Sequence, residues 1–141
     1  IIMDLNAFLH PVKEENLKFV ASKRFLDGEG KPVLWEIKSV STSIDEALRK
    51  ECTKKEPIPG KYGQYTMETD WDKYLGKLAA LCTVYPNLND ISLQNAYGAM
   101  GGDLLLKTML KPGEYAAYLR KVQEFNGFSE TMGELVDEAK N

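Results

Sequence analysis

Apolar and polar positions alternate in the first third of the chain with the two-residue period of β-strands. Residues 17–21 and residues 33–37 both alternate in this way, and the run Asp-Gly-Glu-Gly lies between them at residues 27–30. Such residues tolerate the positive φ angles of hairpin turns. We therefore expect one β-hairpin within residues 18–42. A two-stranded ribbon is marginal alone in water, so the face that carries Trp35 needs a cover from the rest of the chain.

One short helix is expected ahead of the hairpin. Leu5, Phe8 and Leu9 share one helical face, Asp4 can cap the start, and Pro11 cannot continue the helix. This apolar segment has two interpretations, because it can fold onto its own hairpin or dock on a neighbouring subunit. Leu5, Phe8 and Leu9 are therefore candidate contacts with a partner or with a second copy.

The residues after the hairpin predict a second helix and then a break. Ser43 followed by Glu46 is a capping box, and the helix should continue to about Cys52. Residues 53–63 are rich in Lys, Pro and Gly, which exclude a helix or a central strand, and one short strand is expected within residues 62–67. The apolar residues that this second helix should bury are Ile44, Ala47 and Leu48.

Apolar residues recur at helical spacing from Asp70 onward. A broad stripe extends from Trp71 to Tyr85 and ends at Pro86. Pro112 suits the first turn of a later helix, because its missing N–H costs nothing there. The further helices expected are one capped by Ser92 that ends at Tyr97, one over 103–110, one from Pro112 to the C-cap pair 126–127, and a last one capped by Ser129 that carries Met132, Leu135, Val136 and Ala139.

These patterns predict an α+β fold that is mainly α. We expect an N-terminal β-hairpin or small antiparallel sheet with helices, followed by a C-terminal helical bundle. The predicted regions are 1–56, a linker with one short strand over 57–69, and a helical region over 70–141. One continuous domain is the alternative, since 141 residues suit a single core.

Charge and cysteine content exclude several classes of protein. The net charge of −3 is spread over both halves, so no basic surface indicates nucleic acid. No apolar run approaches the ~20 residues of a membrane span, and no signal peptide is visible. Ile1 and Ile2 precede Met3, which is a candidate initiator. Two cysteines and one histidine predict neither a disulfide scaffold nor a zinc module, so we expect a cytosolic protein.

Three places could carry chemistry, and each has a structural explanation. Residues 28–31 lack the spacing of a phosphate loop, so we expect a hairpin turn there. The glycines at 101–102 before Asp103 could bind an anion, or could permit close helix packing. His10 has no second catalytic group linked to it by pattern. We therefore expect no enzyme, no cofactor and no metal site.

Other side chains are candidates for contact with a partner protein. Lys23 and Arg24 form a basic pair that is solvated, is paired within the chain, or faces an acidic partner. Tyr115 and Tyr118 lie in the helical region, where they belong to the core or line a groove for a partner helix.

Several short stretches occur in an order that resembles a family of phage tail assembly chaperones, of the type encoded by PBSX-like prophages and long-tailed phages of Gram-positive bacteria. The similarity covers the chain from about Leu5 to its end. The stretches are Ser22-Lys23-Arg24-Phe25, Gly30-Lys31-Pro32, Trp35-Glu36-Ile37-Lys38, residues 85–89, residues 110–115, Asn126-Gly127-Phe128 and residues 138–141.

The resemblance implies a non-enzymatic role in tail morphogenesis. Such proteins bind the tape measure protein, keep it soluble and recruit tail tube subunits around it. They act in the cytoplasm of the bacterial host and are absent from the mature virion. Self-association into a homo-oligomer is compatible with this role. The alternative functions are a structural virion protein of the tail, such as a completion or connector subunit, and a small enzyme or nucleotide-binding module.

Overall fold

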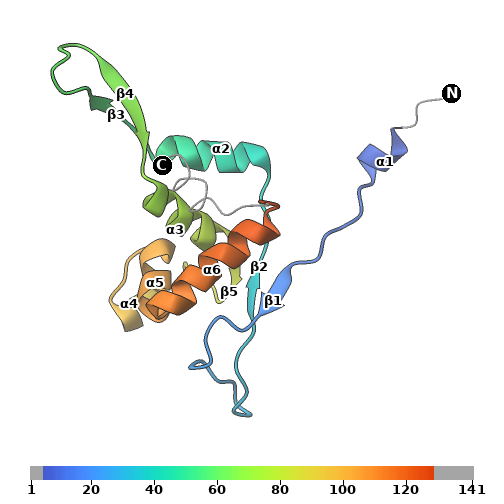
Figure 1. The fold of residues 1–141 in the computed structure, drawn as a ribbon. Helices are drawn as coiled ribbons and strands as arrows, with labels where there is room; N and C mark the ends of the chain where they lie inside the picture. The colour runs from blue at the N-terminus through green and yellow to red at the C-terminus, as the bar shows by residue number, and fades with distance from the viewer. Residues whose placement is uncertain (1–4, 129–141) are drawn as a thin grey trace.

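The computed structural model describes residues 5–128, and its fold is α+β with helices predominating, as the sequence predicts (Figure 1). The elements in chain order are α1 (Asn6–Leu9), β1 (Leu17–Phe19), β2 (Trp35–Ile37), α2 (Thr42–Glu51), β3 (Thr53–Pro57), β4 (Tyr65–Thr69), α3 (Trp71–Cys82), β5 (Thr83–Tyr85), α4 (Ile91–Tyr97), α5 (Gly102–Met109) and α6 (Pro112–Phe125).

The expected hairpin is present and forms part of a three-stranded antiparallel sheet in the order β1-β2-β5. Phe19 lies opposite Trp35, and Leu17 lies opposite Ile37. The long connection between β1 and β2 carries one isolated bridge, Leu26 to Pro32. Its tip is the predicted turn, in which the Asp27 carboxylate accepts hydrogen bonds from the backbone N–H groups of Glu29 and Lys31, at 2.8 and 3.0 Å.

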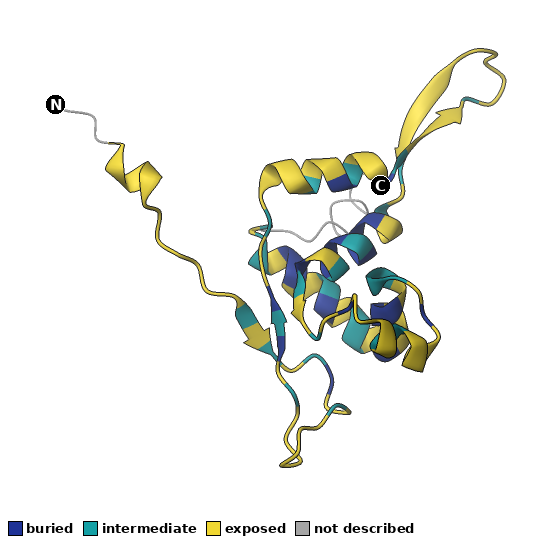
Figure 2. Cartoon of the chain, turned by 180° about the vertical axis from the view of Figure 1, so that it is seen from behind, coloured by how far each residue is buried: buried dark blue, intermediate teal, exposed yellow. Residues whose placement is uncertain are grey.

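Helix α6 covers the face of the hairpin that carries Trp35, which is 1% exposed. The Trp35 ring lies 5.6 Å from the Tyr118 ring and 5.9 Å from the Phe25 ring, measured between centroids. The Phe19 ring is 5.5 Å from Tyr118. The helical part of the chain therefore supplies the cover that the ribbon needs, and Figure 2 shows the burial concentrated where the sheet meets the helices.

Helix α3 is the centre of the helical layer and packs against α2, α5 and α6. Asp70, from which the helical spacing starts, caps α3, since its carboxylate accepts a hydrogen bond from the backbone N–H of Lys73 at 3.1 Å. The buried Tyr74 donates its hydroxyl hydrogen to the Asp45 carboxylate of α2. Asp45 also pairs with Arg49 at 3.2 Å, so one carboxylate joins the two helices.

Two predicted helix caps are each wrong by two residues. Ser41, rather than Ser43, caps α2 by accepting a hydrogen bond from the N–H of Ile44. Asp90, rather than Ser92, caps α4 by accepting from the N–H of Leu93. In both cases the residue further from the helix has the extended backbone that a cap requires, whereas the predicted residue lies inside the first turn.

Helix α3 ends at Cys82, three residues before the predicted end at Tyr85. Thr83 has extended backbone angles and pairs with Ile37 of β2, so the chain leaves the helix to complete the sheet. Pairing with β2 thus makes residues 83–85 a strand, although the spacing of Tyr85 is typical of a helix. The buried Cys82 lies on the apolar face of α3, as predicted.

The expected break after α2 is instead a strand. β3 pairs in antiparallel register with β4, and the two form a projecting hairpin, here called the β3–β4 ribbon (Figure 1). Pro57 is tolerated because both strands of the ribbon are edge strands. The predicted short strand near residues 62–67 corresponds to β4.

Helices α5 and α6 agree with the predictions. Pro112 occupies the first turn of α6, and Asn126 with Gly127, at φ +89°, ends it. Leu105, Leu106 and Met109 of α5 are buried in the core. The predicted cap at Asp4 and the last helix after Ser129 lie outside the described residues.

Truncation of Trp35 should destabilise the fold strongly. We expect Trp35→Ala to lower the free energy of unfolding by ~3–5 kcal/mol, the range for large core truncations, because it removes the ring between Phe25 and Tyr118. The exposed neighbour Leu34 provides the control, and Leu34→Ala should change that free energy by about 0.5 kcal/mol or less. Denaturant unfolding monitored by circular dichroism measures both; equal stability of the two variants would contradict the packing described.

Alkaline pH should also destabilise the fold. Burial raises the pKa of Tyr118, and burial together with the hydrogen bond to Asp45 raises that of Tyr74, both well above the ordinary 10.0. Both hydroxyls stay neutral in the folded chain while the unfolded chain ionises, so stability is complete below about pH 10 and falls as the pH rises beyond it. We expect the melting temperature of Tyr118→Phe to fall less between pH 8 and 11 than that of the parent chain. Tyr62 is exposed, so the melting temperature of Tyr62→Phe should fall with pH as that of the parent does. If the melting temperatures of all three proteins fall equally, the role assigned to Tyr118 is refuted.

Candidate partner-binding surfaces

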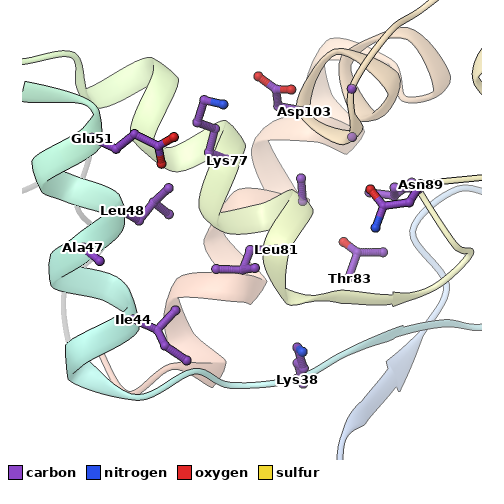
Figure 3. Close-up of a pocket in the computed structure, with 14 residues that line it drawn as sticks. Lys38, Ile44, Ala47, Leu48, Glu51, Lys77, Leu81, Thr83, Asn89 and Asp103 are labelled. Carbon is purple, nitrogen blue, oxygen red and sulfur yellow. The ribbon is translucent and has the colours of Figure 1, made fainter.

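A groove of about 650 Å³ opens between α2 and α3 and is closed at one side by the chain before α5 (Figure 3). We call it the α2–α3 groove. Ile44 and Leu81 are 47% and 42% exposed within it, so large apolar side chains face solvent there. Its lining comprises Lys38, Ile44, Ala47, Leu48, Glu51, Lys77, Ala80, Leu81, Thr83, Leu88, Asn89, Gly101, Gly102 and Asp103.

The groove explains an error in the predicted burial of α2. Of the three apolar residues expected in the core, only Leu48 is buried, whereas Ile44 and Ala47 are exposed. Because α2 packs on α3 through Leu48 and Tyr74–Asp45, the Ile44 side of the helix overhangs the groove. In Figure 3 these side chains lie along α2 at one side of the groove, and Leu81 of α3 faces them.

Charged side chains lie at the ends of the groove. Glu51, Lys77 and Asp103 are at one end, and Lys38 is at the other (Figure 3). An apolar strip bounded by charges of both signs fits an amphipathic helix better than a small polar molecule.

The glycines at the edge of the groove serve packing. A Cβ atom at Gly102 would lie 3.2 Å from the Cβ of Ala80 and 3.3 Å from the Cβ of Leu88, so only glycine lets α5 approach α3 so closely. Gly101 has φ +92°, which L side chains rarely adopt. This agrees with the packing interpretation of residues 101–102 and gives them a role without an anion.

The structure provides little for chemistry elsewhere in the described residues. His10 lies on the exposed α1 and contacts the side chain of Asn6 at 3.0 Å. Within residues 5–128 no three His, Cys, Asp or Glu side chains gather as metal ligands would. None of the helices in this range combines the length and the apolar character that a bilayer crossing requires.

The structure separates the candidate contacts predicted from the sequence. Leu5, Phe8 and Leu9 are 66%, 82% and 69% exposed, on an arm that leaves the body of the molecule (Figures 1 and 2). Residues 5–16 are called the N-terminal arm below. Of the two interpretations of this segment, folding onto its own hairpin is not observed.

Both members of the basic pair are exposed, and Arg24 also makes contacts within the chain. Its guanidinium donates a hydrogen bond to the carbonyl oxygen of Met109 and lies 3.7 Å from the Glu114 carboxylate. The pKa of Glu114 is lowered, first by the backbone N–H of Lys111, then by the Ser22 hydroxyl and by Arg24. Arg24 therefore holds the hairpin loop against α5 and α6, which is the internal pairing considered above.

Tyr118 is a core residue, 1% exposed, with its hydroxyl 2.5 Å from that of Thr83. It is not available to a partner in this fold. Tyr115 is half-buried, and its hydroxyl is enclosed near Gly76 with no hydrogen-bond partner among the described residues. Burial, with the nearby Asp103 and Asp72 carboxylates, raises the pKa of Tyr115.

Comparisons with known proteins agree with the fold. A family model of the phage XkdN-like tail assembly chaperone protein matches residues 5–140. The protein YqbN of Bacillus subtilis (strain 168) is 33% identical over 99% of this chain and 95% of its own length. The phage-like element PBSX protein XkdN of the same organism is 31% identical, with the same coverage.

The three-dimensional comparison covers nearly the same residues. A crystal structure of YqbN has a TM-score of 0.74 and 30% sequence identity, and the match covers 92% of this chain and 100% of that one. Both sequence and fold therefore place this chain in the family of phage XkdN-like tail assembly chaperones.

Proposed function

We propose that this protein binds the tape measure protein of a phage tail without catalysing a reaction, keeps it soluble, and recruits tail tube subunits around it. The protein then acts in the cytoplasm of the bacterial host and is absent from the finished particle. Membership of the tail assembly chaperone family gives the general role. The observation that carries the finer proposal is the α2–α3 groove.

The groove suits an apolar helical segment. Ile44 and Leu81 line it from two helices, and the small Ala47 side chain is part of the same lining. An amphipathic helix anchors in such a groove through apolar residues three and four positions apart, and the charges at both ends can pair with its polar face. A tape measure protein that is helical offers segments of this kind before the tube encloses it.

The proposal also requires that binding be reversible. The groove is open and carries partly exposed rather than fully desolvated anchors, which favours moderate affinity. Tube subunits can therefore displace the chaperone as they assemble.

Co-expression with a tape measure fragment tests the proposed contact. The parent chain should keep the fragment soluble and co-elute with it on size exclusion. Ile44→Asp should abolish the co-elution, because a carboxylate cannot enter the apolar strip without losing its hydration. Ile91→Asp is the matched control, since Ile91 is also an exposed isoleucine in the first turn of a helix but lies outside the groove.

The outcomes of this experiment separate the groove from the function. Equal co-elution of both variants would show that the groove is not the contact. Fragments that remain insoluble with the parent chain, over several fragment boundaries, would refute tape measure binding itself.

Purified particles test the proposed place of action. Mass spectrometry of finished virions should detect tube and tape measure peptides and none from this chain, whereas the lysate of the same induced cells should contain it. Stoichiometric recovery from the particles would identify a structural tail protein instead.

A further inference from the structure

Helix α1 is a single turn that nothing in the described chain covers. All four of its residues are exposed, and its apolar side chains Phe8 and Leu9 face solvent. Isolated helices shorter than about 12 residues are marginal in water, so a one-turn helix needs a surface to pack on. Val12, which follows in the same arm, is 97% exposed.

The β3–β4 ribbon also carries apolar side chains that nothing in the described chain covers. Its register puts Thr53, Lys55 and Pro57 on one face with Tyr65, Met67 and Thr69. The Thr53 and Thr69 hydroxyls lie 2.8 Å apart, and the Lys55 ammonium lies 4.4 Å from the centre of the Tyr65 ring, which confirms that these side chains share a face. The opposite face carries Lys54, Glu56, Thr66 and Glu68.

The ribbon is therefore amphipathic, and its apolar face is open to solvent. Tyr65 and Met67 are 52% and 66% exposed. A two-stranded hairpin with an uncovered apolar face is marginally stable in water, so this face also needs a cover.

Helix α1 and the β3–β4 ribbon cannot pack on each other within one molecule. The N-terminal arm leaves from β1 on one side of the body, and the ribbon projects beyond α2 and α3 on the other (Figures 1 and 2). Residues 11–16 have no secondary structure and can span roughly 20 Å at about 3.3 Å per extended residue, which extends α1 outward to a neighbour.

Charge complements the apolar match. Residues 10–16 of the arm carry one lysine and two glutamates, a net charge of −1. Residues 53–69 of the ribbon carry three lysines and two glutamates, a net charge of +1. Within residues 5–128, Glu14, Glu15, Lys55 and Lys61 take part in no ion pair, and Lys55 lies on the same face of the ribbon as Tyr65 and Met67.

We propose that helix α1 of one copy packs on the apolar face of the β3–β4 ribbon of a second copy. Phe8 and Leu9 contact Tyr65 and Met67, and the glutamates of the arm lie near the lysines of the ribbon. Because the two contacting surfaces differ, the association is head to tail and can continue from copy to copy. This inference is independent of tape measure binding, since it does not use the α2–α3 groove.

Complementation between variants tests the interface in the full chain. Phe8→Asp and Met67→Asp should each weaken self-association about tenfold or more, the scale expected for loss of an interface anchor. An equal mixture should regain association but stop at the dimer, because only one intact arm and one intact ribbon remain for each pair. Light scattering coupled to size exclusion measures the masses, and Ile44→Asp should associate as the parent does.

Disulfide trapping tests the register of the contact. The double variant Phe8→Cys/Met67→Cys should form a ladder of covalent multimers on oxidation, because each copy links to the next. Native Cys52 and Cys82 are 2% and 0% exposed and do not compete. Phe8→Cys/Met100→Cys is the control, since Met100 is exposed but outside the ribbon, and it should give no ladder.

Three results would overturn the inference. These are a parent chain that stays monomeric at every concentration, a mixture of the two aspartate variants that regains no dimer, and a ladder that the Met100 control reproduces. None of them bears on whether the groove binds a tape measure fragment.

Discussion

The contact between the Trp35 ring and Tyr118 is the interaction on which the rest of the structure depends. The strands of the three-stranded sheet are only three residues long, so their backbone hydrogen bonds cannot sustain it in water. Burial of Trp35 and Ile37 beneath α6 provides the missing free energy. The same contact orients α6 against α3, and α3 in turn forms one side of the groove.

The sequence predicts the apolar faces well and their partners less well. The hairpin, the Asp70 cap and the start of α6 at Pro112 follow from local chemistry, which acts within a few residues. Thr83 leaves its helix because it pairs with Ile37 of β2, which is distant in sequence. The residues next to Thr83 in the sequence do not indicate this pairing. The sequence predicts a strand near β4 but not its partner β3, because Lys54 and Pro57 disfavour a strand.

The candidate surfaces were harder to predict than the elements that form them. Ile44 and Ala47 have the spacing of core residues, and only the tilt of α2 over α3 leaves them in a groove. The sequence offers both contact and structural roles for Tyr118 and Arg24, and in the fold they pack against Trp35 and bond to the Met109 carbonyl, groups that are distant in sequence. By contrast, the apolar residues of the N-terminal arm and of the β3–β4 ribbon are not covered by other parts of the described chain.

The bond from Arg24 to the Met109 carbonyl joins residues 85 positions apart, and the side chain of Asn126 accepts a hydrogen bond from the N–H of Val40 across 86 positions. A ribosome adds about 5–20 residues per second, so several seconds separate the synthesis of the hairpin from that of the helix that encloses it. Until α6 is synthesised, the Trp35 ring lacks its contact with Tyr118. The hydrophobic core therefore cannot close before helix α6 has been synthesised.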